Sequence, residues 1–179
     1  MNFINSCLIG YSGTIGKHLQ SKIKFKYKYN SRNIKKINYK KFKLVVCCGL
    51  PGAMNIANQN PGKDLENVNK LIKCISTIQA DKFILISTIQ VFSKLDNKKN
   101  NEFSKNLNNK LPYGKHRRIF EKYCEKKFQK ILIIRLPSIF GKYIKKNFIF
   151  DILNPLPSFL DNKKYKIIYK KLLPNLKES

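Results

Sequence analysis

The N-terminal stretch FINSCLIGYSGTIGKHL, residues 3–19, determines how the rest of the chain is interpreted. Residues 3–9 form a short apolar run that suits a buried strand. The run ends at Gly10, further glycines follow at positions 13 and 16, and residues 17–23 complete a predicted helix. A turn with glycine at every third position between a strand and a helix is typical of a site that binds the pyrophosphate of a dinucleotide.

Each glycine of this turn has its own physical role. Gly10 permits the tight turn, Gly13 lets backbone amides approach a pyrophosphate without an intervening Cβ, and Gly16 lets the helix pack close to the strand. The free amides and the dipole at the helix start then face the anion. The alternative is an ordinary glycine-rich turn. The residues of the turn that we predict to bind the cofactor are Gly10, Ser12, Gly13, Thr14, Ile15 and Gly16.

Composition limits the class of protein. The chain has 179 residues, of which 42% are hydrophobic, so we expect one domain with its own core. No apolar run reaches the length of a membrane span, and the first strand begins too close to Met1 for a signal peptide, so we expect a cytoplasmic protein with no membrane partner. The cysteines lack metal-ligand spacing and should be reduced core residues, and with only two histidines we predict no metal site. The five cysteines are Cys7, Cys47, Cys48, Cys74 and Cys124.

The formal net charge of +27 raises the possibility of a polyanionic partner. However, 33 of the basic residues are lysines and 4 are arginines, and the lysines are scattered along the whole chain. Recognition of bases and phosphates by paired hydrogen bonds favours arginine. We therefore interpret most of the charge as solvated surface and expect no specific nucleic-acid partner.

The second predicted strand, residues 24–30, alternates lysines with aromatic residues. In dinucleotide-binding folds an acid after this strand bonds the ribose 2′-hydroxyl and favours NAD, whereas an arginine accepts the 2′-phosphate of NADP. The turn here, residues 30–33, reads Asn-Ser-Arg-Asn and contains no acid. We predict NADP over NAD, with Ser31 and Arg32 as phosphate ligands; the alternative is a polar surface turn.

The connection after this turn is short. Residues 34–39 leave room for a short turn or a vestigial strand before the next predicted strand, residues 42–48, where a doubly wound half would place another helix and strand. Residues 53–64 are then predicted as a polar loop, in which Pro61 suits a position just inside a helix start. Residues 64–77 are predicted as an amphipathic helix and residues 82–87 as a central parallel strand.

Two further motifs follow. The first is STIQVF, residues 87–92, and the second is PYGKHR, residues 112–117, which opens a helix predicted to end at about Lys127. Together with the spacing of the glycines, they resemble the extended short-chain dehydrogenase/reductases, the NAD-dependent epimerase/dehydratase family. The first motif resembles that family's Ser-Ser/Thr-x-x-Val-Tyr segment, and the second stands where the family has Tyr-x-x-x-Lys.

The resemblance implies catalytic roles. Thr88 would bond the substrate oxygen, Tyr113 would act as acid and base, and Arg117 would hold Tyr113 and the nicotinamide ribose. A cation one helical turn from a phenol favours the phenolate, but Arg replaces the family's Lys and is not equivalent to it, which counts against full catalytic competence. Ile89 and Gln90 replace the acidic pair of the dehydratases and argue against dehydration. The alternatives are a capping hydroxyl at Thr88 and a surface tyrosine at a helix start.

The resemblance also implies further residues around the cofactor. Residues 48–50 resemble the family's Leu-Ala-Ala segment, and Asn67 resembles an asparagine that lines the cleft. A strand predicted over residues 130–136 leads into residues 135–141, which resemble the segment near the nicotinamide. These additional cofactor-binding residues are Cys48, Gly49, Leu50, Asn67 and Pro137.

The domain organisation follows from the extent of the resemblance. Residues 93–111 are predicted as a polar loop where a substrate lid could sit, and residues 147–154 as a short amphipathic helix. We predict an NAD(P)-binding domain over residues 1–154 and a residual segment over residues 155–179, in which residues 165–173 form one strand or a short helix. The substrate-binding half of extended members is then largely missing, which implies a truncated product, a small substrate or a surface supplied by a partner.

The predicted fold class is α/β: a Rossmann-like, doubly wound, mostly parallel sheet with helices on both faces. The predicted function is that of an NAD(P)-dependent oxidoreductase or epimerase that acts on a sugar or sugar nucleotide by hydride transfer. One alternative is a relative that holds NADP(H) without chemistry. Another is a nucleic-acid-binding module, which charge alone would motivate. A homodimer is expected by analogy with the family.

Overall fold

The computed structural model describes residues 2–94, 100–101, 103–104, 107, 110–139, 141, 143 and 152. The helix predicted over residues 147–154 (apart from Ile152), the segment at residues 165–173 and the domain boundary at residue 154 lie outside the described residues. The same holds for much of the loop predicted over residues 93–111. These expectations therefore stay predictions.

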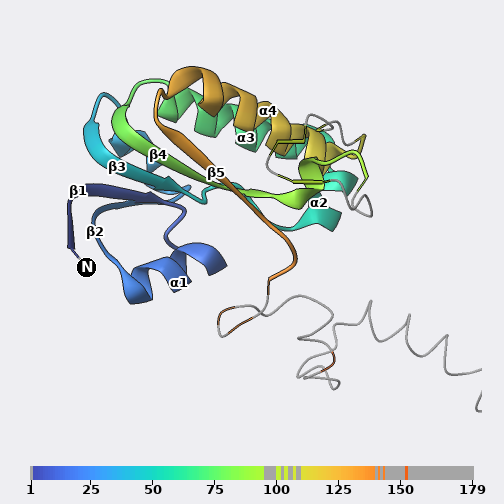
Figure 1. The fold of residues 1–179 in the computed structure, drawn as a ribbon, viewed down its shortest axis with the longest axis horizontal. Helices are drawn as coiled ribbons and strands as arrows, with labels where there is room; N and C mark the ends of the chain where they lie inside the picture. Colours follow the sequence, from blue (N-terminus) through green and yellow to red (C-terminus); the bar gives the residue numbers. More distant parts are fainter. Residues whose placement is uncertain are drawn as a thin grey trace, which may run out of the picture. The chain divides into compact units, whose positions relative to one another are not determined.

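Five parallel strands form one sheet with the order β2-β1-β3-β4-β5 (Figure 1). The order reverses at β1, because the chain places β2 on one side of it and β3 on the other. This arrangement confirms the Rossmann-like prediction. In such folds ligands usually bind at the carboxyl ends of the strands on either side of the reversal, which are β1 and β3 here. The strands are β1 (Asn2–Ile9), β2 (Lys24–Tyr29), β3 (Lys41–Cys47), β4 (Gln79–Thr88) and β5 (Ile131–Leu136).

Helices cover both faces of the sheet, as predicted. Helix α1 (Thr14–Lys22) lies on one face, whereas α3 (Pro61–Ile75) and α4 (Pro112–Lys127) lie side by side on the other (Figure 1). The larger core fills the space between the sheet and these two helices, where Phe83 and Phe120 are almost fully buried. Among the described helices, none combines the length and apolar composition that a membrane crossing needs.

The short connection between β2 and β3 is confirmed. All residues of this connection are described, and they form the single 3₁₀ turn η1 (Ile34–Ile37) in place of a helix and a strand. The side chain of Ile37 is fully buried in the main core. One apolar side chain therefore anchors a connection that is too short to add a strand to the sheet.

The prediction of a loop over residues 53–64 is wrong. The structure has a short helix, α2 (Met54–Gln59), and α3 begins at Pro61 instead of at residue 64. Proline suits the first position of a helix because its missing N–H would have no partner there. The helix α2 has no strong periodic signal of its own and is held by tertiary contacts, including the buried Ala57 and packing against α4.

Candidate functional site

The glycine turn has the tight geometry that its spacing predicted. Gly10 has a φ of +91°, which favours glycine, and a Cβ there would overlap the carbonyl oxygen of Cys48. A Cβ on Gly16 would overlap the backbone carbonyl of Gly10. Both glycines are buried, so the packing of α1 and of the strand ends requires them.

Gly13 differs from the other two glycines because the fold does not require it. It is exposed, its φ of −75° suits any residue, and a Cβ would lie 3.4 Å from the Gly10 carbonyl oxygen, an ordinary contact. Gly13 is also the N-cap of α1, and within the described part of the chain no side chain caps the amides that follow it. An open surface of backbone amides at a helix N-terminus fits a bound phosphate group.

The turn after β2 lies against the glycine turn. The side-chain amide of Asn30 donates to the hydroxyl of Ser12 at 3.3 Å, and its carbonyl oxygen accepts the backbone N–H of Arg32 at 3.0 Å. Ser31 and Arg32 are both exposed. The structure therefore places the predicted 2′-phosphate ligands beside the predicted pyrophosphate site.

The segment after β3 closes the other side of the turn. The backbone N–H and the thiol of Cys48 both donate to the carbonyl oxygen of Ile9, at 2.9 and 3.2 Å. Burial raises the pKa of Cys48 to about 12, so its thiol is neutral near pH 7. A Cβ on Gly49 would lie 2.9 Å from the Ile9 side chain, and Leu50 packs on the main core.

The predicted catalytic hydroxyls come from two elements. Thr88 ends β4, is half-buried, and its Oγ1 accepts the backbone N–H of Gln90 at 3.2 Å. Tyr113 lies in the first turn of α4, where its backbone N–H donates to Oδ1 of Asn58 on α2 at 2.9 Å. Its side chain is buried, and the guanidinium carbon of Arg117 lies 4.4 Å from the ring centroid. The structure thus brings Arg117 against the face of the Tyr113 ring.

Arg117 also contacts a buried acid that the sequence reasoning missed. Both carboxylate oxygens of Asp64 on α3 accept from Arg117 at 2.9 Å, and Nδ1 of His116 lies 2.8 Å from Oδ2. Burial alone would raise the pKa of Asp64, but the hydrogen bonds from Arg117 and His116 outweigh it and hold the pKa below its usual value. The sequence contained a signal for the burial of Asp64, because Asp64 shares a helical face with Val68 and Leu71 on the apolar stripe of α3.

A second buried acid, Glu121 on α4, was also missed. It is 0% exposed, and it accepts hydrogen bonds from Ser87 at 2.6 Å, from Arg118 at 2.9 Å and from two nitrogens of Arg135 at 3.0 Å. Ser87 and Arg135 are paired neighbours on β4 and β5. Glu121 therefore ties the carboxyl ends of these two strands to the helix that carries Tyr113.

The parallel strands bring the remaining predicted residues to one edge of the sheet. Gly10, Cys48, Thr88 and Pro137 follow or end β1, β3, β4 and β5, whose carboxyl ends share this edge. Pro137 is exposed. Asn67 is half-buried on α3, and its placement leaves its predicted role untested.

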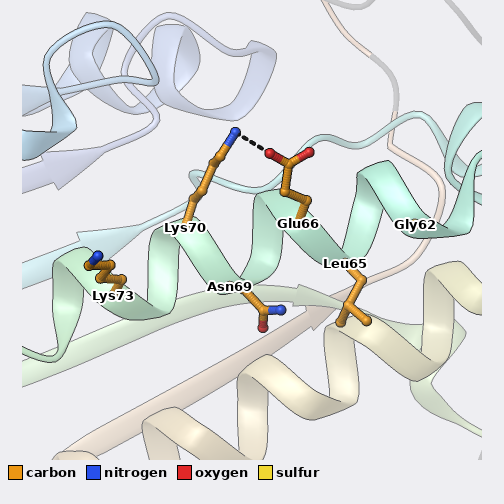
Figure 2. A pocket seen from close by; sticks show the side chains of 6 residues that line it. All are labelled: Gly62, Leu65, Glu66, Asn69, Lys70 and Lys73. Atoms are coloured by element: carbon orange, nitrogen blue, oxygen red, sulfur yellow. Dashed lines mark ion pairs between the residues drawn. The ribbon is translucent and has the colours of Figure 1, made fainter.

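A separate hollow lies on the outer face of α3 (Figure 2). In the view of Figure 2, Lys70 and Glu66 form an ion pair, with an N–O distance of 2.6 Å. None of the predicted site residues lines this hollow, so we do not assign it to the site. Its lining residues are Gly62, Leu65, Glu66, Asn69, Lys70 and Lys73.

Solved structures of sugar-nucleotide enzymes share this fold. The chain matches dTDP-4-dehydrorhamnose reductase from Bacillus anthracis in complex with NADP, at 17% identity and a TM-score of 0.65 over 83% of this chain. It also matches UDP-N-acetylglucosamine 4-epimerase from Methanobrevibacter ruminantium in complex with UDP-N-acetylmuramic acid, at 18% identity and a TM-score of 0.66 over 87% of this chain. The chain spans 58% and 64% of those two proteins.

The comparison of the sequence with curated proteins and its comparison with protein families give different results. No curated protein matches the sequence. The NAD dependent epimerase/dehydratase family matches residues 22–158, a match that begins after the glycine turn and covers well over half of the chain. The order of strands, the glycine turn and this match lead to one conclusion: the chain belongs to the NAD dependent epimerase/dehydratase family.

Proposed function

We propose that the chain is an NAD(P)-dependent oxidoreductase or epimerase that acts on a sugar nucleotide by hydride transfer. The observation that carries the proposal is Gly13, an exposed glycine that the fold does not require, at the uncapped start of a helix in a dinucleotide-binding fold. The family membership supports an NAD-type cofactor. The amides after Gly13 would hold the pyrophosphate, and Arg32 would hold the 2′-phosphate of NADP.

The roles proposed at the reacting centre are those that the family resemblance implies for Thr88, Tyr113 and Arg117, and one hydrogen bond of the site is compatible with the role of Thr88. Because Oγ1 of Thr88 accepts from the Gln90 amide, its own hydrogen is left to donate to a substrate oxygen. Tyr113 would take the proton of the substrate hydroxyl when the sugar carbon is oxidised and return it on reduction. Arg117 would hold the Tyr113 ring, and a contact from Arg117 to the ribose stays a prediction. The nicotinamide of the bound cofactor supplies the hydride acceptor or donor.

One observation favours a second function, a protein that binds NADP(H) without chemistry. The two terminal nitrogens of Arg117 donate to Asp64 and to the carbonyl oxygen of Pro51, so the cation serves groups other than a phenolate. Turnover of any nucleoside diphosphate sugar by the purified chain would exclude this second function.

The proposed phosphate site predicts opposite effects of one substitution on binding and on stability. Gly13→Asp should abolish NADPH binding, because a carboxylate there repels the phosphates and fills the open surface. It should leave the melting temperature unchanged or slightly raised, since aspartate is a favourable N-cap. Nicotinamide fluorescence titration and thermal unfolding measure the two effects. Gly62→Asp is the matched control, because Gly62 lies in the first turn of α3 with nothing within 4 Å of its Cβ position. NADPH binding that survives Gly13→Asp would contradict the site.

The choice between NADP and NAD gives a second prediction. Arg32→Ala should weaken NADPH binding about tenfold and leave NADH binding within about twofold, because the side chain would contact only the 2′-phosphate. Lys36→Ala removes another exposed cation nearby in the sequence and should change neither affinity. Competitive titration of both cofactors measures the ratio, and an equal loss for NADPH and NADH would overturn the assignment of Arg32.

A further inference from the structure

Asp64 is a buried acid that the proposed chemistry does not use. It lies in the first turn of α3, is 4% exposed, and is paired with Arg117 and His116 of α4, which are 4% and 7% exposed. A carboxylate withdrawn from water is stable only while charged or hydrogen-bonding partners compensate it. The orientation of Asp64 and that of Arg117 are therefore coupled.

Arg117 carries this coupling into the proposed site. Besides its two bonds to Asp64, its Nη2 atom donates to the carbonyl oxygen of Pro51 at 2.6 Å, and its guanidinium covers the ring of Tyr113. Pro51 directly follows residues 48–50, which come after the end of β3 and belong to the proposed cofactor site. A guanidinium bonded to both oxygens of one carboxylate has a fixed plane. The Asp64 carboxylate thus determines the direction of the remaining N–H of Arg117 and of the face of its guanidinium.

We infer that Asp64 is a positioning residue: through Arg117 it holds the Pro51 segment (residues 51–53, just before α2) and the Tyr113 ring in the places that cofactor and substrate require. The inference rests on the proposed function, because it names the proposed cofactor site as the place that is held. It also predicts a local effect on the protein that needs no cofactor, namely on α2, which directly follows the Pro51 segment.

The test is Asp64→Asn in the full chain, because asparagine keeps the shape and one acceptor oxygen but removes the charge. We expect the dissociation constant of NADPH to rise about tenfold and amide exchange across α2 to accelerate about tenfold, while exchange in the central strands β3 and β4 stays unchanged. Glu66→Gln is the matched control. It makes the same charge change on the same helix, where the Glu66 side chain is 47% exposed and pairs with Lys63. Glu66 also pairs with Lys70 (Figure 2), and the substitution should move neither readout.

A double substitution separates positioning from general stability. Arg117→Lys should weaken NADPH binding about tenfold in the unaltered chain but less than about threefold when Asp64→Asn is present, since both changes break one arrangement. Fully additive losses, or exchange that rises uniformly over the sheet, would overturn the inference. If Asp64→Asn does not fold, Arg117→Lys alone provides the test, and we then expect faster amide exchange that is confined to α2. If the unaltered chain binds no NADPH, the proposed function fails, and the exchange pattern alone decides whether Asp64 positions this segment.

Discussion

Tyr113→Phe is expected to lower turnover by about 10²- to 10⁴-fold, the usual contribution of a positioned acid or base. The substitution removes one hydroxyl and little else. The ring keeps its place under the Arg117 guanidinium, and the bond to Asn58 comes from the backbone N–H. NADPH affinity and melting temperature should therefore stay within experimental error of the unaltered chain.

The measurement is the oxidation or reduction of a panel of nucleoside diphosphate sugars, followed by nicotinamide absorbance. Tyr123→Phe is the control, because Tyr123 is a half-buried tyrosine on the same helix that was not assigned to the site. Full turnover by Tyr113→Phe would remove Tyr113 from the mechanism. A chain that binds NADPH but turns over none of these sugars would favour the second function, binding without chemistry.

Glu121→Ala is expected to reduce the free energy of unfolding by about 3–5 kcal/mol, the range seen when one partner of a buried ion pair is removed. Arg135 and Ser87, which are both partly buried, would lose their acceptor, because the Glu121 side chain that bonds them is 0% exposed. The carboxyl ends of β4 and β5 would lose their shared anchor on α4, so we expect the edge of the sheet that carries Thr88 to loosen as well.

Urea unfolding of the two variants Glu121→Ala and Glu125→Ala measures the effect. Glu125 also accepts from Arg118, but its side chain is 39% exposed, and the loss of such a pair costs about 1 kcal/mol or less. Equal destabilisation by both substitutions would mean that the buried cluster around Glu121 contributes no more than a surface ion pair.

Most of the fold could be predicted because its signals are local. The strand predicted over residues 3–9 and those over 24–30, 42–48, 82–87 and 130–136 correspond to the five observed strands, with boundaries that shift by up to three residues. Apolar runs between turn residues suit buried parallel strands. The helix α2 could not be predicted this way, because packing against α4 and the contact from Asn58 to Tyr113 stabilise it more than its own sequence does.

The candidate site was predictable only where a backbone property defines it. The tight turn at Gly10 and the close approach at Gly16 are requirements of single residues, so their spacing was informative. Asp64 and Glu121 were missed because a charged residue on a helix is usually solvated, and the sequence does not state which charges face each other. For Asp64 the available signal was its position on the apolar stripe of α3.

By itself, the sequence determined the strand–glycine turn–helix unit, the alternation of strands and helices, and the one-turn spacing of Tyr113 and Arg117, because each depends on backbone conformation over a few residues. Only the tertiary structure decided what Arg117 binds. Asp64 and Pro51 lie far from Arg117 in the sequence, and they meet it because α3 and α4 pack side by side on the sheet. The partners of a buried charge are set by such packing, since burial leaves the charge no water to bind.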